Sequence, residues 1–215
     1  MSENFWKYFN EYAAPLLAHR ADSFRFAFQH LTNLNRPVCI VETGCVRNEG
    51  TFSGEGQSTL LFDKFSEFVK GTIVNTVDIS SQSTDMCKKI VSNRIKVHTM
   101  DSVSFLRNDC ANHIAPFHHI DLLYLDSYDV DLNNPHDSAL HHLKELLAAS
   151  QLINKTTLIL IDDSPSVASF FVNDGQIQFA SNPKVGGKGM YVGSYMSSIG
   201  NQPIIQSYQT GWLGL

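Results

Sequence analysis

The stretch Val38-Cys39-Ile40-Val41-Glu42-Thr43-Gly44-Cys45 decides the fold. A short apolar run ends at an acid and a glycine, and after a loop the chain continues as Gly56-Gln57-Ser58-Thr59-Leu60-Leu61. This order predicts a buried strand, a glycine-bearing turn and the start of a helix, which is typical of a nucleotide-type cofactor site. A carboxylate such as Glu42 is costly to bury unless it faces a ligand or a hydrogen-bond donor. It would repel a pyrophosphate, so we expect a ligand that carries positive charge.

The composition restricts the classes of protein. The chain has 215 residues, of which 43% are hydrophobic and 17% charged, and we expect one domain over residues 1–215. The net charge of −5 provides no basic surplus for phosphates, so no nucleic-acid partner is expected. The sequence contains no apolar run of membrane-spanning length and no evident signal peptide. Its four cysteines lack metal-binding spacing. We therefore expect reduced thiols, no membrane partner and a cytoplasmic location.

The N-terminal segment, residues 1–36, is expected to be helical. Aromatic and aliphatic residues recur at three-to-four spacing over residues 4–34, and Pro15 is expected to divide the segment into two helices. Three roles remain open for it. The segment packs on the flank of a sheet, covers a substrate pocket or forms the face of a homodimer.

Residues 37–215 alternate between strand and helix patterns. Strands are expected at 38–43, 72–79, 95–99, 120–126 and 156–161, and helices at 58–69, 81–91 and 135–152. A helix over 165–172 and a hairpin that pairs 190–196 with 203–208 are also expected. Such alternation predicts an α/β, Rossmann-like three-layer sandwich, in which a mostly parallel sheet carries an antiparallel edge hairpin.

Acidic residues stand at or just beyond the end of each expected parallel strand. They are Glu42, Asp78, Asp101, Asp126 and Asp162. The carboxyl ends of parallel strands line one crevice, where ligands bind in open α/β sheets. Helix capping is an alternative role for Asp101 and Asp162.

Five segments together resemble the class I S-adenosylmethionine-dependent methyltransferases over about residues 37–210. They are Val-Glu-Thr-Gly (41–44), Val-Asp-Ile (77–79), Met-Asp-Ser (100–102), Leu-Tyr-Leu-Asp (123–126) and Leu-Ile-Asp-Asp (160–163). The segment from Glu42 to Leu60 is similar to small bacterial members related to macrocin O-methyltransferase and the cephalosporin hydroxylase-like group. The resemblance implies a seven-stranded sheet with a reversed last strand. About ten residues separate Gly44 from Gly54, where many members have only a few.

The resemblance also implies which residues hold S-adenosylmethionine. Glu42 would bind the ammonium group, and Gly44 would let the backbone approach the ligand. Amides around Gly56, Gln57 and Ser58 would bind the carboxylate, and Asp78 the ribose hydroxyls. Asp101 and Ser102 would contact the adenine, and Asp126 would border the cofactor.

The same resemblance implies a magnesium site and an acceptor site. Asp126, Asp162 and Asp163 match the metal ligands of catechol- and macrocin-type O-methyltransferases, and hard oxygen ligands suit Mg²⁺. The alternative is that Asp126 orients a ligand and Asp163 caps a helix, with Asp129 and Asp131 as other possible ligands. Asp126 and His136 are the candidate catalytic residues. His141 and His142 are weaker candidates for the base, and Lys188 and Tyr128 are candidates for contacts with the acceptor.

We therefore expect a methyltransferase that acts on an oxygen of a small-molecule acceptor. Two other interpretations stay open. A non-catalytic cofactor-binding protein would share the fold, and an NAD-type oxidoreductase would share the strand–glycine–helix order. The absence of a compact GxGxxG motif after the first strand argues against the oxidoreductase.

Overall fold

The computed structural model describes residues 3–55, 57–131, 133–166, 168–173, 176–181 and 184–215, with backbone only at 53, 55, 168–173 and 176–181. Its centre is a seven-stranded sheet with the order β3-β2-β1-β4-β5-β9-β8. The strands are β1 (Cys39–Thr43), β2 (Ile73–Asp78), β3 (Ile95–Thr99), β4 (Leu122–Leu125), β5 (Leu158–Ile161), β8 (Ile205–Gln206) and β9 (Thr210–Leu213). Strands β1 to β5 are parallel, and β9 is antiparallel to both β5 and β8. The predicted α/β sandwich with a reversed edge hairpin is confirmed.

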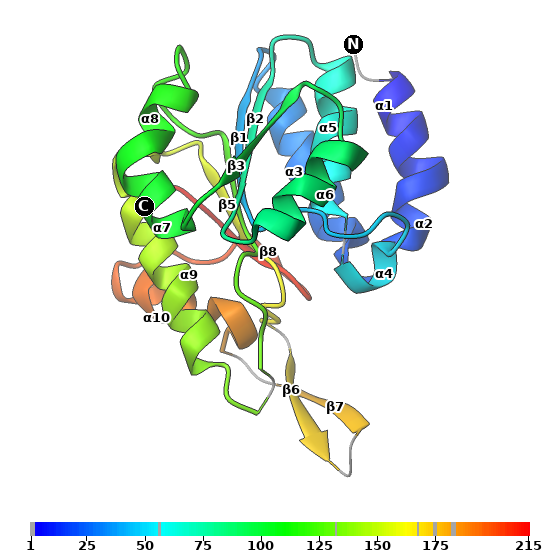
Figure 1. Cartoon of the computed structure of the whole chain (residues 1–215). Helices are drawn as coiled ribbons and strands as arrows, with labels where there is room; N and C mark the ends of the chain where they lie inside the picture. The colour runs from blue at the N-terminus through cyan, green and yellow to red at the C-terminus, as the bar shows by residue number, and fades with distance from the viewer. Residues whose placement is uncertain (1–2, 56, 132, 167, 174–175, 182–183) are drawn as a thin grey trace.

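Helices cover both faces of the sheet (Figure 1). Successive strand residues point to opposite faces, so each central strand contributes to two separate cores. Ile40 and Leu160 belong to one core, and Val41 and Ile161 belong to the other. The first core includes α1 (Glu3–Tyr8), α3 (Ala21–Asn33) and α5 (Ser58–Phe68). The second includes α8 (Cys110–His113), α9 (His136–Ala149) and α10 (Met190–Ser198), while α6 (Ser81–Ile90) lies beside β2 and β3.

The N-terminal segment packs on the sheet, as one of the three expected roles proposed. Phe5, Phe9, Phe24 and Phe28 are fully buried in the first core, where their rings contact one another. The expected division at Pro15 was misplaced. The helical run continues from α1 through η1 (Phe9–Ala13) and α2 (Ala14–Leu16), because Pro15 occupies the first turn of α2, where no N–H is needed. The break comes at Ala18, with φ of 50°, which opens the short helix η2 (Ala18–Arg20).

Two expected elements near the C-terminus were wrong. The segment expected to be a helix over 165–172 instead forms β6 (Ala168–Asn173), paired with β7 (Gln176–Ser181) in a hairpin that projects from the sheet (Figure 1). The run Phe-Phe-Val at 170–172 has the composition that favours strands, whereas position 167 lies outside the described residues. The segment 190–196, expected to be a strand, is helix α10.

The error at 190–196 has a physical reason. Val192 and Met196 are both fully buried, and they are four residues apart, which is the helical spacing. Gly193 brings α10 against Val185, whose Cβ would lie 2.7 Å from a Cβ added at position 193. The antiparallel hairpin is formed by β8 and β9 instead. No helix in the described residues has both the length and the apolar character of a membrane span.

Candidate functional site

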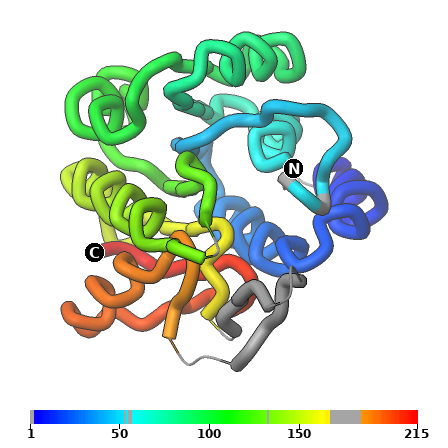
Figure 2. The backbone as a smooth tube through the Cα atoms, turned by 60° about the horizontal axis from the view of Figure 1, so that its bottom comes forward, coloured from blue at the N-terminus to red at the C-terminus, as the bar shows by residue number. Residues whose placement is uncertain are grey.

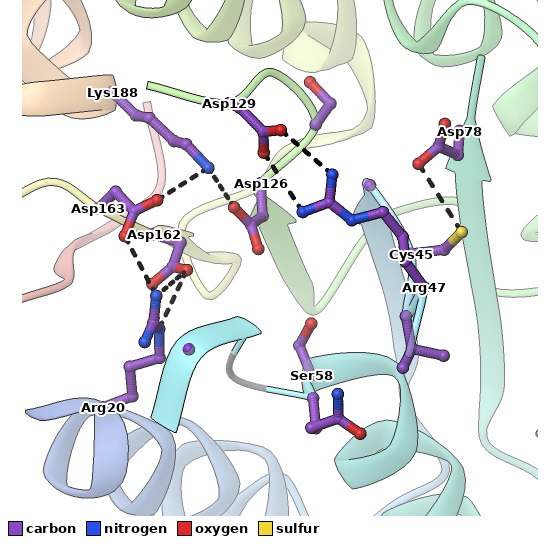
Figure 3. Close-up of a pocket in the computed structure, with 15 residues that line it drawn as sticks. Arg20, Cys45, Arg47, Ser58, Asp78, Asp126, Asp129, Asp162, Asp163 and Lys188 are labelled. Atoms are coloured by element: carbon purple, nitrogen blue, oxygen red, sulfur yellow. Dashed lines mark hydrogen bonds and ion pairs between the residues drawn. The ribbon is translucent and has the colours of Figure 1, made fainter. Parts of the chain in front are cut away.

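A pocket lies where the predicted crevice was expected, beyond the carboxyl ends of β1, β2, β4 and β5. Figure 2 turns this edge toward the viewer, and Figure 3 shows the side chains. Fifteen of the described residues line the pocket: Arg20, Gly44, Cys45, Val46, Arg47, Gly54, Gln57, Ser58, Asp78, Asp126, Ser127, Asp129, Asp162, Asp163 and Lys188. They include five aspartates, two arginines and one lysine. The acidic surplus favours a cationic ligand.

Gly44 is required by close packing at the point where the strand order reverses. Its φ is 82°, and an added Cβ would lie 2.5 Å from the carbonyl oxygen of Asp126. Its N–H donates to the carbonyl of Val77 at 2.8 Å. The glycine thus lets the turn after β1 pass directly against the turn after β4, and both turns line the pocket.

Glu42 lies behind the pocket wall. Its two carboxylate oxygens accept hydrogen bonds from the hydroxyls of Ser58, at 2.5 Å, and Thr59, at 2.7 Å. Burial raises the pKa of Glu42 to about 7, although these hydrogen bonds lower it. In this structure Ser58 lines the pocket, and Glu42 fixes the start of α5 against β1. Contact of Glu42 with an ammonium group stays a prediction.

The loop between Gly44 and α5 is folded and anchored. Gln57, with φ of 51°, is buried, and its amide donates to the carbonyl of Asn48 at 2.6 Å and accepts from the N–H of Gly50 at 3.2 Å. The loop contains α4 (Phe52–Glu55), and the ring of Phe52 packs edge-on against Tyr12 of the N-terminal segment. The additional residues of this loop therefore join the pocket to the N-terminal helices (Figure 2). Gly56, predicted to bind the carboxylate, lies outside the described residues.

Of the acids predicted at the ends of β2 and β3, only Asp78 lines the pocket. Its carboxylate accepts from the N–H of Ser80 at 2.8 Å and from the thiol of Cys45 at 3.7 Å. Asp101 accepts from the N–H of Ser104 at 2.8 Å, which confirms its alternative role as a helix cap. Ser102 makes a hydrogen bond to His141 instead of facing the described pocket. Contacts of this pair with adenine remain a prediction.

The three predicted metal ligands do converge. Asp126, Asp162 and Asp163 each offer an oxygen within 4.8 Å of the others. Two buried cations share the cluster, and Figure 3 shows both reaching into it. Arg20 binds Asp162 through Nε at 2.8 Å and Nη2 at 2.9 Å, and Nη2 lies 3.1 Å from Asp163. Lys188 Nζ donates to Asp126 and lies 3.1 Å from Asp163.

These cations remain charged. Burial alone would lower the pKa of Lys188, but the attraction of Asp126 and Asp163 holds it above its usual value. Burial would likewise raise the pKa of Asp163, but Lys188 and the Tyr208 hydroxyl, 2.5 Å away, hold it below its usual value. Lys188 and Asp163 are therefore both charged, whereas burial raises the pKa of Asp126 well above its usual value despite its contact with Lys188. Arg20 was missed by the sequence analysis, because a single arginine between two helical patterns carries no signal of what it will contact.

The predicted histidines lie elsewhere. His136 is exposed, makes a 2.7 Å hydrogen bond to the hydroxyl of Tyr191 and is not among the residues that line the pocket. His142 is fully buried, and burial lowers its pKa to about 4. His141 lies 3.3 Å from buried Glu145, which also accepts from Ser127 at 2.7 Å. The base assignment to His136 stays untested, and the geometry gives it no contact with the acid cluster.

The remaining acids and Tyr128 belong to the loop after β4. Asp129 lines the pocket and pairs with Arg47 at 3.1 Å, so this ion pair joins the loops after β1 and β4 (Figure 3). Asp131 accepts from the N–H of Asn133 at 2.8 Å. Tyr128 is half-exposed, and its carbonyl accepts from Ser138. None of these three contacts the acid cluster.

No protein-family profile and no curated protein matches this chain. Solved structures do match its fold. An apo structure of CalS11, described as TDP-rhamnose 3′-O-methyltransferase, gives a TM-score of 0.58 at 12% identity over 99% of this chain and 92% of that one. A second CalS11 structure, of a calicheamicin methyltransferase, gives 0.56 at 12% identity over 99% and 90%. DesVI of Streptomyces venezuelae gives 0.51 at 8% identity over 99% of both chains. The chain has the Rossmann-like fold of these solved structures, of which the two of CalS11 are described as methyltransferases.

Proposed function

We propose that this protein is an S-adenosylmethionine-dependent methyltransferase that acts on an oxygen of a small-molecule acceptor. The observation that carries the proposal is the pocket at the reversal of strand order, which Gly44 lines and Asp78 borders with a carboxylate. Ligands bind at this point in open α/β sheets. Its acidic surplus suits a cofactor with a sulfonium and an ammonium group.

Residues of the pocket would divide the cofactor among them. Asp78 has two oxygens and would accept hydrogen bonds from two neighbouring ribose hydroxyls. The N-terminus of α5, next to Ser58, would bind the carboxylate through backbone N–H groups. The cofactor supplies the methyl group on a good leaving group, so the chain needs mainly to align the acceptor oxygen with it.

The acid cluster would form the acceptor side of the pocket. Asp126 borders the pocket at the end of β4, and Lys188, Asp162 and Asp163 lie beside it. The similarity of residues 42–60 to the macrocin O-methyltransferase group, and the CalS11 fold match, favour a sugar hydroxyl as the first acceptor class to test. His136 is not part of this proposal, because its hydrogen bond to Tyr191 ties it to α10.

Calorimetry with S-adenosylhomocysteine tests the cofactor part. The wild-type protein should bind it, and Asp78→Ala should weaken binding at least about tenfold, because it removes hydrogen bonds to a charged acceptor. Asp85→Ala is the matched control, since Asp85 is an exposed acid on α6 that pairs with Lys88, at 3.7 Å, and does not line the pocket. No binding by the wild-type protein at millimolar ligand would refute the proposal.

The two alternatives give different results. A non-catalytic protein would bind S-adenosylhomocysteine and transfer no methyl group to any acceptor in a panel of nucleotide sugars and phenols. An NAD-type oxidoreductase would bind NAD and would not bind S-adenosylhomocysteine.

A further inference from the structure

The acid cluster has carboxylate oxygens of the kind that Mg²⁺ prefers, but most of these oxygens already accept hydrogen bonds from other side chains. Five of its six carboxylate oxygens accept hydrogen bonds from described residues. Both oxygens of Asp162 bind Arg20, and one of them also accepts from Gln209 at 2.8 Å. Those of Asp163 bind Arg20, Tyr208 and Lys188. One oxygen of Asp126 binds Lys188.

The fold fixes Lys188 beside the acid cluster through burial, a backbone hydrogen bond and close packing of its segment. Its side chain is only 2% exposed, so its ammonium group is shielded from water and contacts the carboxylates instead. Its backbone N–H donates to the carbonyl of Asp163 at 3.0 Å. At the next residue, a Cβ on Gly189 would lie 2.6 Å from Cβ of Ser164, so the segment η5 (Gly187–Gly189) packs directly on the turn after β5.

The charges of the cluster also argue against a divalent metal. Two buried cations contact the three acids, so they balance most of the negative charge that the cluster can carry. A divalent metal bound by all three acids would have to share them with an ammonium group in contact with two of them. Repulsion between the metal and this ammonium group in a buried site would oppose binding of the metal. The residues present therefore do not fit a divalent metal.

We propose that Lys188 is the permanent cation of the acid cluster, and that the site binds an acceptor hydroxyl without a divalent metal. The ammonium group has three N–H donors, and the described contacts use two of them. The second oxygen of Asp126 has no hydrogen-bond donor among the described residues, and Figure 3 shows it without a marked contact. A free N–H beside a free carboxylate oxygen fits a hydroxyl, which both accepts and donates. The hydroxyl part of this inference rests on the proposed function.

Binding of Mn²⁺, followed by the electron paramagnetic resonance signal of the free ion, tests the metal part without an acceptor. With protein at about 200 μM, a site with a Kd of about 100 μM would remove more than half of the signal of ~50 μM Mn²⁺. The wild-type protein should leave the signal unchanged. Stoichiometric loss of the signal would overturn the inference.

Lys188→Met supplies the complementary test, because it removes the cation and keeps an unbranched apolar side chain of similar size. The folded variant should bind Mn²⁺ at least about tenfold more tightly than the wild-type protein, since three acids then face Arg20 alone. Lys155→Met, at an exposed lysine, should behave like the wild-type protein. A folded Lys188→Met protein that binds no Mn²⁺ would also count against the inference.

Transfer assays test the hydroxyl part on the full-length protein. A hydroxyl acceptor from the panel of nucleotide sugars and phenols should be methylated at the same rate in excess EDTA and in Mg²⁺. A requirement for Mg²⁺ would overturn the inference and leave the proposed function standing. Failure to bind S-adenosylhomocysteine would overturn the proposed function and leave the Mn²⁺ result unaffected.

Discussion

Replacement of Gly44 by alanine should destabilise the protein severely. At φ of 82°, a residue with a Cβ costs roughly 1–2 kcal/mol in the left-handed region. The added Cβ would also lie 2.5 Å from the carbonyl oxygen of Asp126 and 3.0 Å from its carbon. These are backbone atoms of the neighbouring turn, so the strain has no flexible side chain to absorb it. Overpacking of this kind costs about 1–3 kcal/mol, so the expected loss is about 2–5 kcal/mol.

Gly50→Ala is the matched control. Gly50 lies in the same loop with φ of 88°, and a Cβ added there would have no heavy atom within 4 Å. It therefore pays only the backbone term, about 1–2 kcal/mol. The difference between the two variants isolates the contact with the turn after β4.

Urea unfolding monitored by circular dichroism, with linear extrapolation to water, measures both losses. Gly44→Ala should lose about 1–3 kcal/mol more than Gly50→Ala. It should also bind S-adenosylhomocysteine more weakly, because Asp126 and Ser127 line the pocket. Equal losses in the two variants would refute the close approach of the turns after β1 and β4.

Two further variants test buried charges. Glu42 has a pKa of about 7 in the folded protein against an ordinary value of 4.5. Between these pH values the folded state therefore holds a proton that the unfolded state has lost. Stability should therefore fall by about 3 kcal/mol as the pH rises from 4.5 to 7, and Glu42→Gln should abolish this fall when urea unfolding is measured across the range. Arg20→Met should cost about 3–5 kcal/mol in the same assay, because it leaves Asp162 buried without its cation. The exposed Lys88→Met should change stability by less than about 0.5 kcal/mol, and a similar loss in both variants would contradict the buried pairing.

The central part of the fold was predictable because its signals are local. The parallel strands are short and rich in apolar or β-branched residues, and an acid ends or closely follows each one. The position of Asp78 or Asp126 in the crevice therefore needs only the strand assignment. Glu42 shows the limit of prediction from local sequence. Its place at the end of β1 was predicted, but its partners Ser58 and Thr59 lie 16 and 17 residues later, and they turn it away from the pocket lining.

The errors occurred where tertiary contacts override local patterns. The segment 190–196 has short apolar runs that fit a strand or a helix, and packing against Val185 and α9 decides for the helix. Asp101 had two predicted roles, and the cap is satisfied within its own turn, at 2.8 Å. The metal prediction counted the acids correctly. It could not include Arg20, which is 142 residues from Asp162 in sequence and pairs with it only through the fold.

Arg20 gives the N-terminal segment a role in the site as well as in the core. Residues 1–36 were expected to pack on the sheet, cover a substrate pocket or form the face of a homodimer. In addition, η2 supplies a buried guanidinium group to the acid cluster at the end of β5. Near the other end of the chain, η5 supplies Lys188 to the same cluster. Removal of either segment would leave carboxylates buried without a cation, which is more costly than the loss of an apolar contact. The N-terminal helices and the segment after β7 are therefore parts of the site itself. Because both must dock before the acid cluster has its two cations, the pocket is complete only when both segments have packed against the carboxyl ends of the sheet.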